Sequence, residues 1–447
     1  MLFRKAYDEI KRWIDDDNRG LLVAGARQVG KTTLIRKCLL DNNINFVEIN
    51  LLENSLALEA FNSSKNSMEL MIRLTAIAHK EIDDNTVFFI DEIQEANDAI
   101  TPMKFLIDDR KYKFVFSGSL LGVKLKDISS IGVGYIKLVN MYPLDFEEFA
   151  IANGVSSKTI DYLYDCYINN NKVDNIVHEQ MINLFNTYLV IGGMPDAVNC
   201  FIETHNIQKV IDRIKNIDET YLIDITKYDK KDKLLIEDIY NIIPRELNAQ
   251  NKRLILKSLN EKARFYQYEE SFVWLKGSGV GLFTYNISNP VYPLLASKER
   301  TLFKLFLCDV GILSYKLLNG NQIKILNNEV NINYGALYEQ VVAQELTCQG
   351  FPLFYSNNKA KGEIDFLIED DSDVIPIEVK SGKDYKRHSA LDNFIISYNC
   401  KNSIIFTNDN VQINNGKKYY PIYMIMFLIK NRHNYDEIFI PNISSLI

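Results

Sequence analysis

The sequence predicts an α/β protein built from several domains, and three observations carry this prediction. The chain has 447 residues, which at ~100–200 residues per domain suggests two to four domains. Short apolar segments that end in polar turns alternate with helical patterns at the start of the chain, as in a parallel sheet. The middle of the chain loses strand character, and strand and helix patterns alternate again from about residue 300.

The composition is that of an ordinary globular protein. Hydrophobic residues make up 47% of the chain and charged residues 24%, which excludes a disordered chain, a coiled-coil rod and a collagen-like repeat. The formal net charge of −7 argues against a protein covered throughout in positive charge for nucleic acid, although it leaves room for a local basic patch.

No targeting or membrane-spanning segment is expected. The first residues mix charged and apolar side chains, unlike a signal peptide. The longest apolar stretch, Tyr419 to Ile429, contains Pro421 and is well short of the ~20 residues that a spanning helix needs. The 6 cysteines and 5 histidines are scattered, which disfavours a zinc site and favours reduced thiols in a cytoplasmic protein.

The patterns divide the chain into four expected modules. A hairpin is expected around Gly277–Gly281, and the steps Asn289-Pro290 and Tyr292-Pro293 suggest a linker or the entry to a strand. The modules are 1–150, an α/β domain; 151–235, a helical region; 236–290, short helices and the hairpin; and 300–447, a second α/β domain.

The strongest motif is GARQVGKT, which fits G-x-x-x-x-G-K-[ST] between an apolar strand and a helix. Such a loop turns its backbone N–H groups around a β-phosphate, and Gly30 permits the close approach. Lys31 can reach the β- and γ-phosphates, and the Thr32 hydroxyl can ligate Mg²⁺. The residues expected to contact the nucleotide here are Gly25, Ala26, Arg27, Gln28, Val29, Gly30, Lys31, Thr32 and Thr33.

An acid pair follows the next buried strand, in the sequence VFFIDE. Asp91 would hold Mg²⁺ directly or through water, and Glu92 would orient and deprotonate the attacking water. Acids at strand ends also cap helices, and the P-loop upstream favours the catalytic interpretation. The following strand ends in Ser117-Gly118-Ser119, where Ser117 would contact the γ-phosphate or belong to a serine-rich turn.

Five segments in order resemble a family of prokaryotic AAA-type ATPases whose members carry a C-terminal domain of unknown function similar to PD-(D/E)XK nucleases. The segments are GARQVGKTTL, FFIDEIQEA, FVFSGSLLGV, MYPLDFEEFA and YLVIGGMPDAV. The resemblance covers nearly the whole chain and implies a AAA-type parallel sheet with a helical lid over residues 151–235. It also implies that Gly193 and Pro195 contact the nucleotide; the alternative is a turn that ends a helix.

One departure from the family pattern concerns an arginine. Many members have a Gly-Arg pair shortly before the PL-F-EF motif, where this chain reads GVGYIKLVNMYPLDF. An arginine finger, worth ~10³–10⁵ in rate in other nucleotide hydrolases, is therefore not assigned. This departure favours slow turnover or switching by occupancy.

A second set of acids lies in the C-terminal module. Glu378 and Lys380 are two residues apart on an expected strand and share one face, and Asp365 lies on the strand before it. This D-(x)n-E-x-K pattern is typical of phosphodiester cleavage, with carboxylates holding Mg²⁺ or Mn²⁺ and Lys380 orienting water or stabilising charge. Glu339 and Glu345 both fall on the apolar arc of a helix, and the resemblance selects Glu339 as a further ligand. The alternative is an inherited fold whose acids form internal ion pairs.

Two basic segments lie in this half of the chain. Residues 245–264 are followed by FYQYEESFVWLKGSGV, which looks like the second helix and wing of a winged-helix domain within 236–290. Glu269 and Glu270 on its helix would repel DNA, so a solvated face or a protein-docking domain is the alternative. In the first segment the basic residues, against Glu246 and Glu261, are Arg245, Lys252, Arg253, Lys257, Lys262 and Arg264. In the second segment, beside His388, the basic residues against Asp384 are Lys380, Lys383, Lys386 and Arg387.

The sequence therefore predicts a cytoplasmic ATP-binding protein, a Mg²⁺-dependent AAA ATPase coupled to a nuclease-like domain that binds or cleaves DNA or RNA. The alternative is an ATP-dependent switch that docks a protein partner and carries a catalytically dead nuclease-like domain. A third alternative is a nucleic-acid binder without cleavage. No pattern in the chain predicts an oligomeric state.

Overall fold

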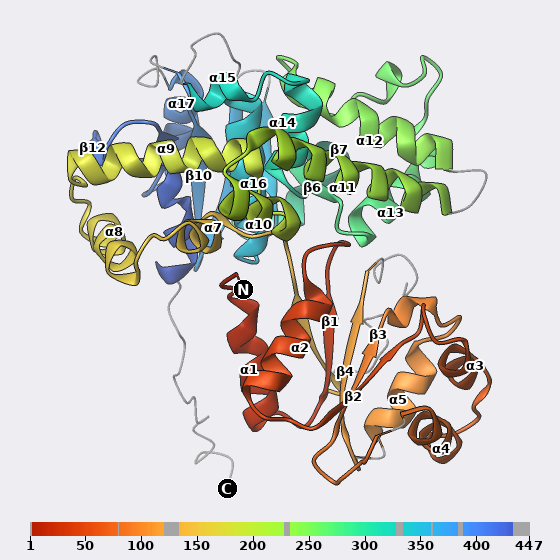
Figure 1. The fold of residues 1–447 in the computed structure, drawn as a ribbon. Helices are drawn as coiled ribbons and strands as arrows, with labels where there is room; N and C mark the ends of the chain where they lie inside the picture. The colour runs from red at the N-terminus through yellow and green to blue at the C-terminus, as the bar shows by residue number, and fades with distance from the viewer. Residues whose placement is uncertain are drawn as a thin grey trace, which may run out of the picture.

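The computed structural model describes residues 2–78, 80–108, 110–119, 134–227, 233–327, 334–358, 361–382 and 388–431. The chain forms an N-terminal unit, red to orange in Figure 1, and a larger second unit, yellow to blue, each built around one sheet. The expected basic residues Lys383, Lys386 and Arg387, with Asp384, lie outside the described residues.

The N-terminal unit contains a sheet of five parallel strands in the order β2-β3-β4-β1-β5, here called sheet A. Alternate residues of each strand face opposite sides: Val87 and Phe89 share a core with α1 and α2, whereas Phe88 and Ile90 share one with α3, α4 and α5. The strands are β1 (Gly20–Ala24), β2 (Phe46–Asn50), β3 (Val87–Asp91), β4 (Lys113–Gly118) and β5 (Ile136–Asn140). The helices are α1 (Ala6–Asp16), α2 (Lys31–Asp41), α3 (Ser55–Ser63), α4 (Ser67–Ala78) and α5 (Ile100–Asp108). The predicted parallel α/β sheet is confirmed.

A group of helices follows β5 and packs against the second unit rather than standing alone. Figure 1 shows α9, α11 and α14 in front of the second sheet, and their apolar side chains share one core with that sheet and with α1 and α2. These helices are α7 (Phe146–Ala152), α8 (Ser157–Asn169), α9 (Asn175–Ile191), α10 (Pro195–Thr204), α11 (Ile207–Lys227), α12 (Lys233–Asn248) and α14 (Val310–Leu318).

The second unit is built around a mixed sheet of eight strands in the order β12-β13-β11-β10-β9-β8-β6-β7, here called sheet B. The helix α16 packs on one face of this sheet and α17 on the other. The strands are β6 (Gly281–Ile287), β7 (Lys298–Leu307), β8 (Phe354–Asn358), β9 (Gly362–Asp370), β10 (Asp373–Val379), β11 (Ile404–Thr407), β12 (Gln412–Asn414) and β13 (Lys417–Pro421). Further helices are α13 (Glu269–Gly277), α15 (Ile323–Leu326), α16 (Tyr334–Cys348) and α17 (Ser389–Tyr398).

The structure differs from the expected modules between residues 277 and 307. The hairpin expected around Gly277–Gly281 is instead the turn between α13 and β6. β6 pairs with β7 on one side and with β8 on the other, so both strands belong to sheet B and the expected break at residues 290–300 falls inside one hairpin. The physical reason is that β6 is buried along nearly its whole length, as in a strand covered on both faces, whereas a wing is exposed.

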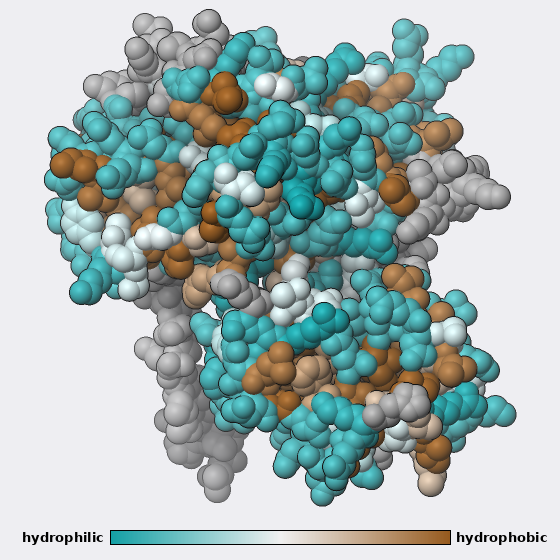
Figure 2. Space-filling view, viewed as in Figure 1, coloured by the Kyte–Doolittle hydropathy of each residue, from teal (hydrophilic) through white to brown (hydrophobic). Residues whose placement is uncertain are grey.

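None of the described helices is both long and apolar enough to span a membrane. The apolar stretch that begins at Tyr419 forms the end of β13 and then a short 3₁₀ segment, Ile422–Asn431. All six cysteines are free thiols. The face of the molecule shown in Figure 2 is mainly hydrophilic, with hydrophobic side chains gathered in separate patches on both units.

Candidate functional site

The P-loop joins the end of β1 to the start of α2 at the carboxyl edge of sheet A. Gly30 has a φ of 91°, in the left-handed region that favours glycine. The Lys31 side chain folds back into the loop, where its Nζ donates to the carbonyl oxygens of Gly25, at 3.1 Å, and Ala26, at 2.9 Å. The loop therefore closes around its own lysine.

The Lys31 ammonium group is buried beside two acids. Burial lowers the pKa of Lys31 to about 8, against the opposing effect of Glu92 and Asp91. A buried cation whose hydrogen bonds go to carbonyl groups can exchange them for the oxygens of an anion. This geometry suits a polyphosphate.

Asp91, the last residue of β3, is held by three neighbours. Its Oδ2 accepts from Thr32 Oγ1 at 2.9 Å and from Asn50 Nδ2 at 3.5 Å, and its Oδ1 accepts from Ser117 Oγ. Ser117, which the sequence predicted to contact the γ-phosphate, thus donates a hydrogen bond to the carboxylate of Asp91. The Thr32 hydroxyl and the Asp91 carboxylate are hard oxygen donors, so the pair fits Mg²⁺.

Glu92 has a φ of 56°, a left-handed conformation that is unfavourable for a residue with a Cβ and that concentrates at functional sites. Its carboxylate accepts a hydrogen bond from Gln94 Nε2, which also lies 3.4 Å from Ser119 Oγ. The carboxylate of Glu92 is therefore oriented at the same sheet edge as Asp91 and Lys31.

The remaining P-loop residues face the helices of the second unit. Arg27 Nη1 lies 2.9 Å from Asp224 Oδ1, and Gln28 Nε2 lies 3.4 Å from Thr220 Oγ1, both on α11. A Cβ on Gly30 would lie 3.7 Å from Pro195 Cγ, so Pro195 lies against the loop, and its contact with the nucleotide stays a prediction.

Val29 is buried and its carbonyl accepts from Arg4 Nη1 at 2.9 Å, whereas Thr33 is exposed on α2. Gly193 has a structural reason of its own. A Cβ there would lie 2.0 Å from Leu144 O, while its N–H donates to Asp309 Oδ2 at 2.6 Å. This close packing accounts for a glycine at position 193, and its contact with the nucleotide stays a prediction.

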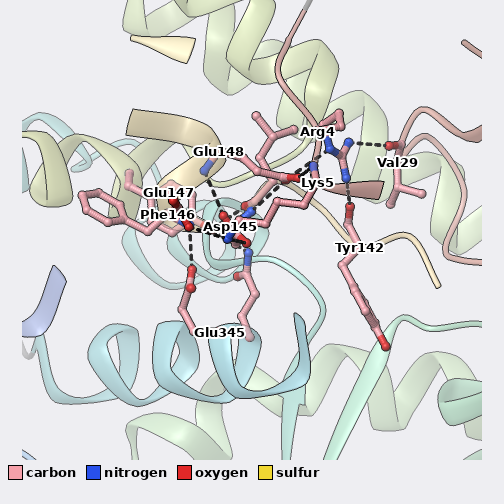
Figure 3. A network of polar contacts seen from close by, with 12 residues as sticks. Arg4, Lys5, Val29, Tyr142, Asp145, Phe146, Glu147, Glu148 and Glu345 are labelled. Carbon is pink, nitrogen blue, oxygen red and sulfur yellow. Dashed lines mark hydrogen bonds and ion pairs between the residues drawn. The ribbon is translucent and has the colours of Figure 1, made fainter. Parts of the chain in front are cut away.

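The PLDFEEF segment forms a polar junction between the two units (Figure 3). Asp145 and Glu148 form a capping box at the start of α7. Lys5 Nζ lies 2.6 Å from Asp145 Oδ2, and Arg4 Nε lies 3.1 Å from Glu148 Oε2. The Phe146 N–H donates to Glu345 Oε1 of α16 at 2.7 Å. The segment thus contacts both the N-terminal residues Arg4 and Lys5 and the helix α16, which packs on sheet B.

The C-terminal acids do gather, but Glu339 is neutralised by lysines. Lys252 Nζ contacts Glu339 Oε1, and the fully buried Lys304 lies 3.4 Å from Glu339 Oε2 and 2.7 Å from Glu363 Oε1. Burial would raise the pKa of Glu339, but Lys304 and Lys252 lower it below its usual value. The basic segment at residues 245–264 therefore reaches this site through Lys252.

Asp365, Glu378 and Lys380 form the other half of the cluster. Asp365 Oδ2 accepts from the Val379 N–H at 2.9 Å, and Lys380 Nζ lies 2.7 Å from Glu378 Oε2. Glu378 Oε1 is buried without a hydrogen-bond partner among the described residues. Burial and Asp365 raise the pKa of Glu378 to about 8, and burial and Glu339 raise that of Asp365 to about 6.

A carboxylate oxygen without a partner suits a cation, but the acids of this cluster do not form a complete metal cage. Within the described part of the chain, no three His, Cys, Asp or Glu side chains are arranged to hold a metal ion. His388 is buried near Lys380, and burial, Lys380 and Lys417 lower its pKa to about 4.

Sequence reasoning missed the residues that brace both sites. Arg4, Asp224 and Lys304 carry no local motif, and each is distant in sequence from the group it contacts. Gln94 lies in the FFIDEIQEA segment, two residues after Glu92, and this spacing was the only indication in the sequence that its side chain contacts Glu92.

Comparisons with known proteins assign the N-terminal unit. Residues 17–150 match the family described as AAA domain. Residues 182–322 and 334–425 match two families described as Domain of unknown function, DUF8612 and DUF4143. No curated protein matches the chain. The match supports the prediction of a P-loop domain of the AAA type in the N-terminal unit, and the descriptions of the other two families name no activity.

Several solved structures are similar to this chain at low identity. A Walker-type ATPase of Pyrococcus abyssi is 14% identical over 71% of this chain and 96% of its own, with a TM-score of 0.44. PCH-2 of C. elegans is 19% identical over 38% of this chain and 46% of its own, with a TM-score of 0.22. Pif1 of Bacteroides sp is 14% identical over 37% of this chain and 50% of its own, with a TM-score of 0.20.

Proposed function

We propose that this chain binds ATP with Mg²⁺ in its N-terminal unit and hydrolyses the ATP. The observation that carries the proposal is the convergence of Lys31, Asp91 and Glu92 at one edge of sheet A, with Thr32 Oγ1 2.9 Å from Asp91. The match of residues 17–150 to the AAA domain supports it.

The residues of the site have distinct tasks in this reaction. The backbone N–H groups of the loop and the start of α2 bind the phosphates, and Lys31 exchanges its carbonyl partners for phosphate oxygens. Thr32 and Asp91 would hold Mg²⁺, which when bound neutralises charge on the β- and γ-phosphates.

Glu92 is placed to act as the general base. It accepts a proton from the attacking water as the water oxygen bonds to the γ-phosphorus. The bond from that phosphorus to the β–γ bridging oxygen breaks, and ADP leaves with the electron pair. The products are ADP and inorganic phosphate.

Hydrolysis is tested by phosphate release from the full chain and from Glu92→Gln. We expect Glu92→Gln to bind ATP as the unchanged protein does and to release phosphate ~10²–10⁴-fold more slowly, the usual contribution of a general base. The exposed Glu59→Gln, on α3, is the matched control and should keep full activity. Equal rates in all three proteins would contradict the assignment.

We propose, as a second candidate function, metal-assisted cleavage of DNA or RNA by Asp365, Glu378 and Lys380. The observation in its favour is the buried Glu378 Oε1, which has no hydrogen-bond partner in the part of the chain that the structure describes. A hard cation would be stabilised in this geometry. The lysines on Glu339 favour the alternative instead, in which this domain is inactive and ATP controls the docking of a protein partner.

The two alternatives differ in one assay. Single- and double-stranded DNA and RNA are incubated with the full chain and with Asp365→Ala, while Mn²⁺ and ATP are varied independently. Cleavage that needs Mn²⁺ and Asp365 supports the nuclease. Absence of cleavage under every condition would contradict it and support the switch, and binding that weakens steeply with salt would support a nucleic-acid binder.

A further inference from the structure

Two of the four P-loop residues between Gly25 and Gly30, Arg27 and Gln28, contact one helix of the second unit. Arg27 Nη1 lies 2.9 Å from Asp224 Oδ1, and Arg27 O accepts a hydrogen bond from Tyr221 Oη at 3.1 Å. Gln28 Nε2 lies 3.4 Å from Thr220 Oγ1. The loop that would bind the phosphates is therefore also the contact surface of α11.

The guanidinium group of Arg27 also lies beside the catalytic groups. Its Nε is 3.4 Å from Ser119 Oγ, which lies 3.4 Å from Gln94 Nε2, and Gln94 in turn donates to Glu92. This chain of contacts joins Arg27 to the proposed general base. A γ-phosphate bound between Lys31 and Glu92 would be near a cation that is already at the edge of the site.

The partner of Arg27 is buried, which links any movement of the arginine to α11. The Asp224 side chain is 5% exposed and that of Arg27 is 23% exposed. Removing one partner from a buried ion pair leaves the charge of the other partner less compensated. If Arg27 turned to a phosphate, Asp224 would lose this ion pair, and the contact between the loop and α11 would change.

We propose that Arg27 is a switching catalytic residue that pairs with Asp224 without ATP and with the γ-phosphate when ATP is bound. In the second state its charge stabilises the transition state, the task of the arginine that is missing before the PL-F-EF segment. The loss of the Asp224 contact transmits the binding of the γ-phosphate to α11, and through α11 to the rest of the second unit. The inference rests on the proposed ATPase function.

The test compares ADP with a non-hydrolysable ATP analogue, each with Mg²⁺, on the full chain and on Arg27→Ala. We expect Arg27→Ala to keep its ADP affinity, to lose ATP-analogue affinity by about 5- to 150-fold, and to release phosphate ~10³–10⁵-fold more slowly. Arg27→Lys should not restore the rate, because lysine lacks the planar fork of donors.

A purely structural role for Arg27 would weaken both nucleotides equally, and that result would overturn the proposal. Phosphate release within tenfold of the unchanged protein would also overturn it. If the full chain binds neither nucleotide, the proposed ATPase function itself fails, which is a different outcome from a selective loss in Arg27→Ala.

A second variant keeps the test independent of the folding of Arg27→Ala. In Asp224→Asn the arginine no longer has an ion pair to break, so the affinity for the ATP analogue should rise while that for ADP stays the same. Asp196→Asn, which removes a carboxylate from an exposed pair between α10 and α11, is the matched control. Unchanged preference between the nucleotides in Asp224→Asn would contradict the switch.

Discussion

At the scale of single residues, the two acid sites differ in how their carboxylates are satisfied. Both oxygens of Asp91 accept hydrogen bonds, from Thr32 and Ser117, whereas Glu378 has one oxygen bonded and one buried without a partner among the described residues. The P-loop motif predicted Lys31 and Thr32, and the acid pair that follows a buried strand predicted Asp91. Neither pattern could predict Arg4 or Asp224, whose contacts depend on how distant segments pack.

The buried Glu378 predicts a pH-dependent stability. Burial and Asp365 raise its pKa from 4.5 to about 8, so the folded chain keeps a proton that the unfolded chain releases between these values, and stability falls as pH rises across this window. Glu378→Gln cannot ionise. We expect its melting temperature to exceed that of the unchanged protein by more at pH 9 than at pH 5, by at least about 2 °C.

The matched control for this measurement is Glu270→Gln, which changes an exposed glutamate on α13. Its difference in melting temperature from the unchanged protein should not vary with pH. A gain in Glu378→Gln that is equal at both pH values, or larger at pH 5, would contradict the burial of an ionisable carboxyl at this position.

At the scale of elements, the PLDFEEF segment joins the N-terminal unit, with its P-loop, to the second unit. Arg4 reaches the carbonyls of Val29 and Tyr142 and the carboxylate of Glu148 (Figure 3). In the PLDFEEF segment, the N–H of Phe146 donates to Glu345 on α16. The strand and helix patterns predicted the elements of sheet A. They did not predict that β6 and β7 join sheet B, because the partner strand, β8, is distant in sequence.

The junction predicts a large loss of stability in Arg4→Ala. The side chains of Arg4 and Glu148 are each 6% exposed, and breaking a buried pair costs ~3–5 kcal/mol. Burial and Asp145 already raise the pKa of Glu148 to about 7, against the effect of Arg4. Urea denaturation of the full chain should show this loss in the free energy of unfolding.

Arg73→Ala is the comparison for Arg4→Ala. It removes a half-exposed pair with Glu69, four residues apart on α4, and helix pairs at this spacing contribute only ~0.3–0.5 kcal/mol. Equal losses in the two variants would show that the junction does not hold the units together.

At the scale of the whole molecule, the two units share one hydrophobic core, and the second unit contacts the phosphate-binding loop directly. Tyr221 and Asp224 of α11 contact Arg27, and a Cβ on Gly279 would lie 3.3 Å from Ala26 N. A ligand bound in the loop would therefore lie next to residues that contact the second unit. The sequence predicted the two α/β units and the helices between them, but the contact between α11 and the loop is a product of packing.

Binding of ATP to the loop is measured by the shift in melting temperature that ATP with Mg²⁺ produces. Lys37→Ala is the matched control, since Lys37 lies on the same helix with its side chain 40% exposed. We predict that ATP raises the melting temperature of the unchanged protein and of Lys37→Ala, because a ligand that binds only the folded state stabilises it. Lys31→Ala should show no shift. A shift in Lys31→Ala as large as in the unchanged protein would contradict the account.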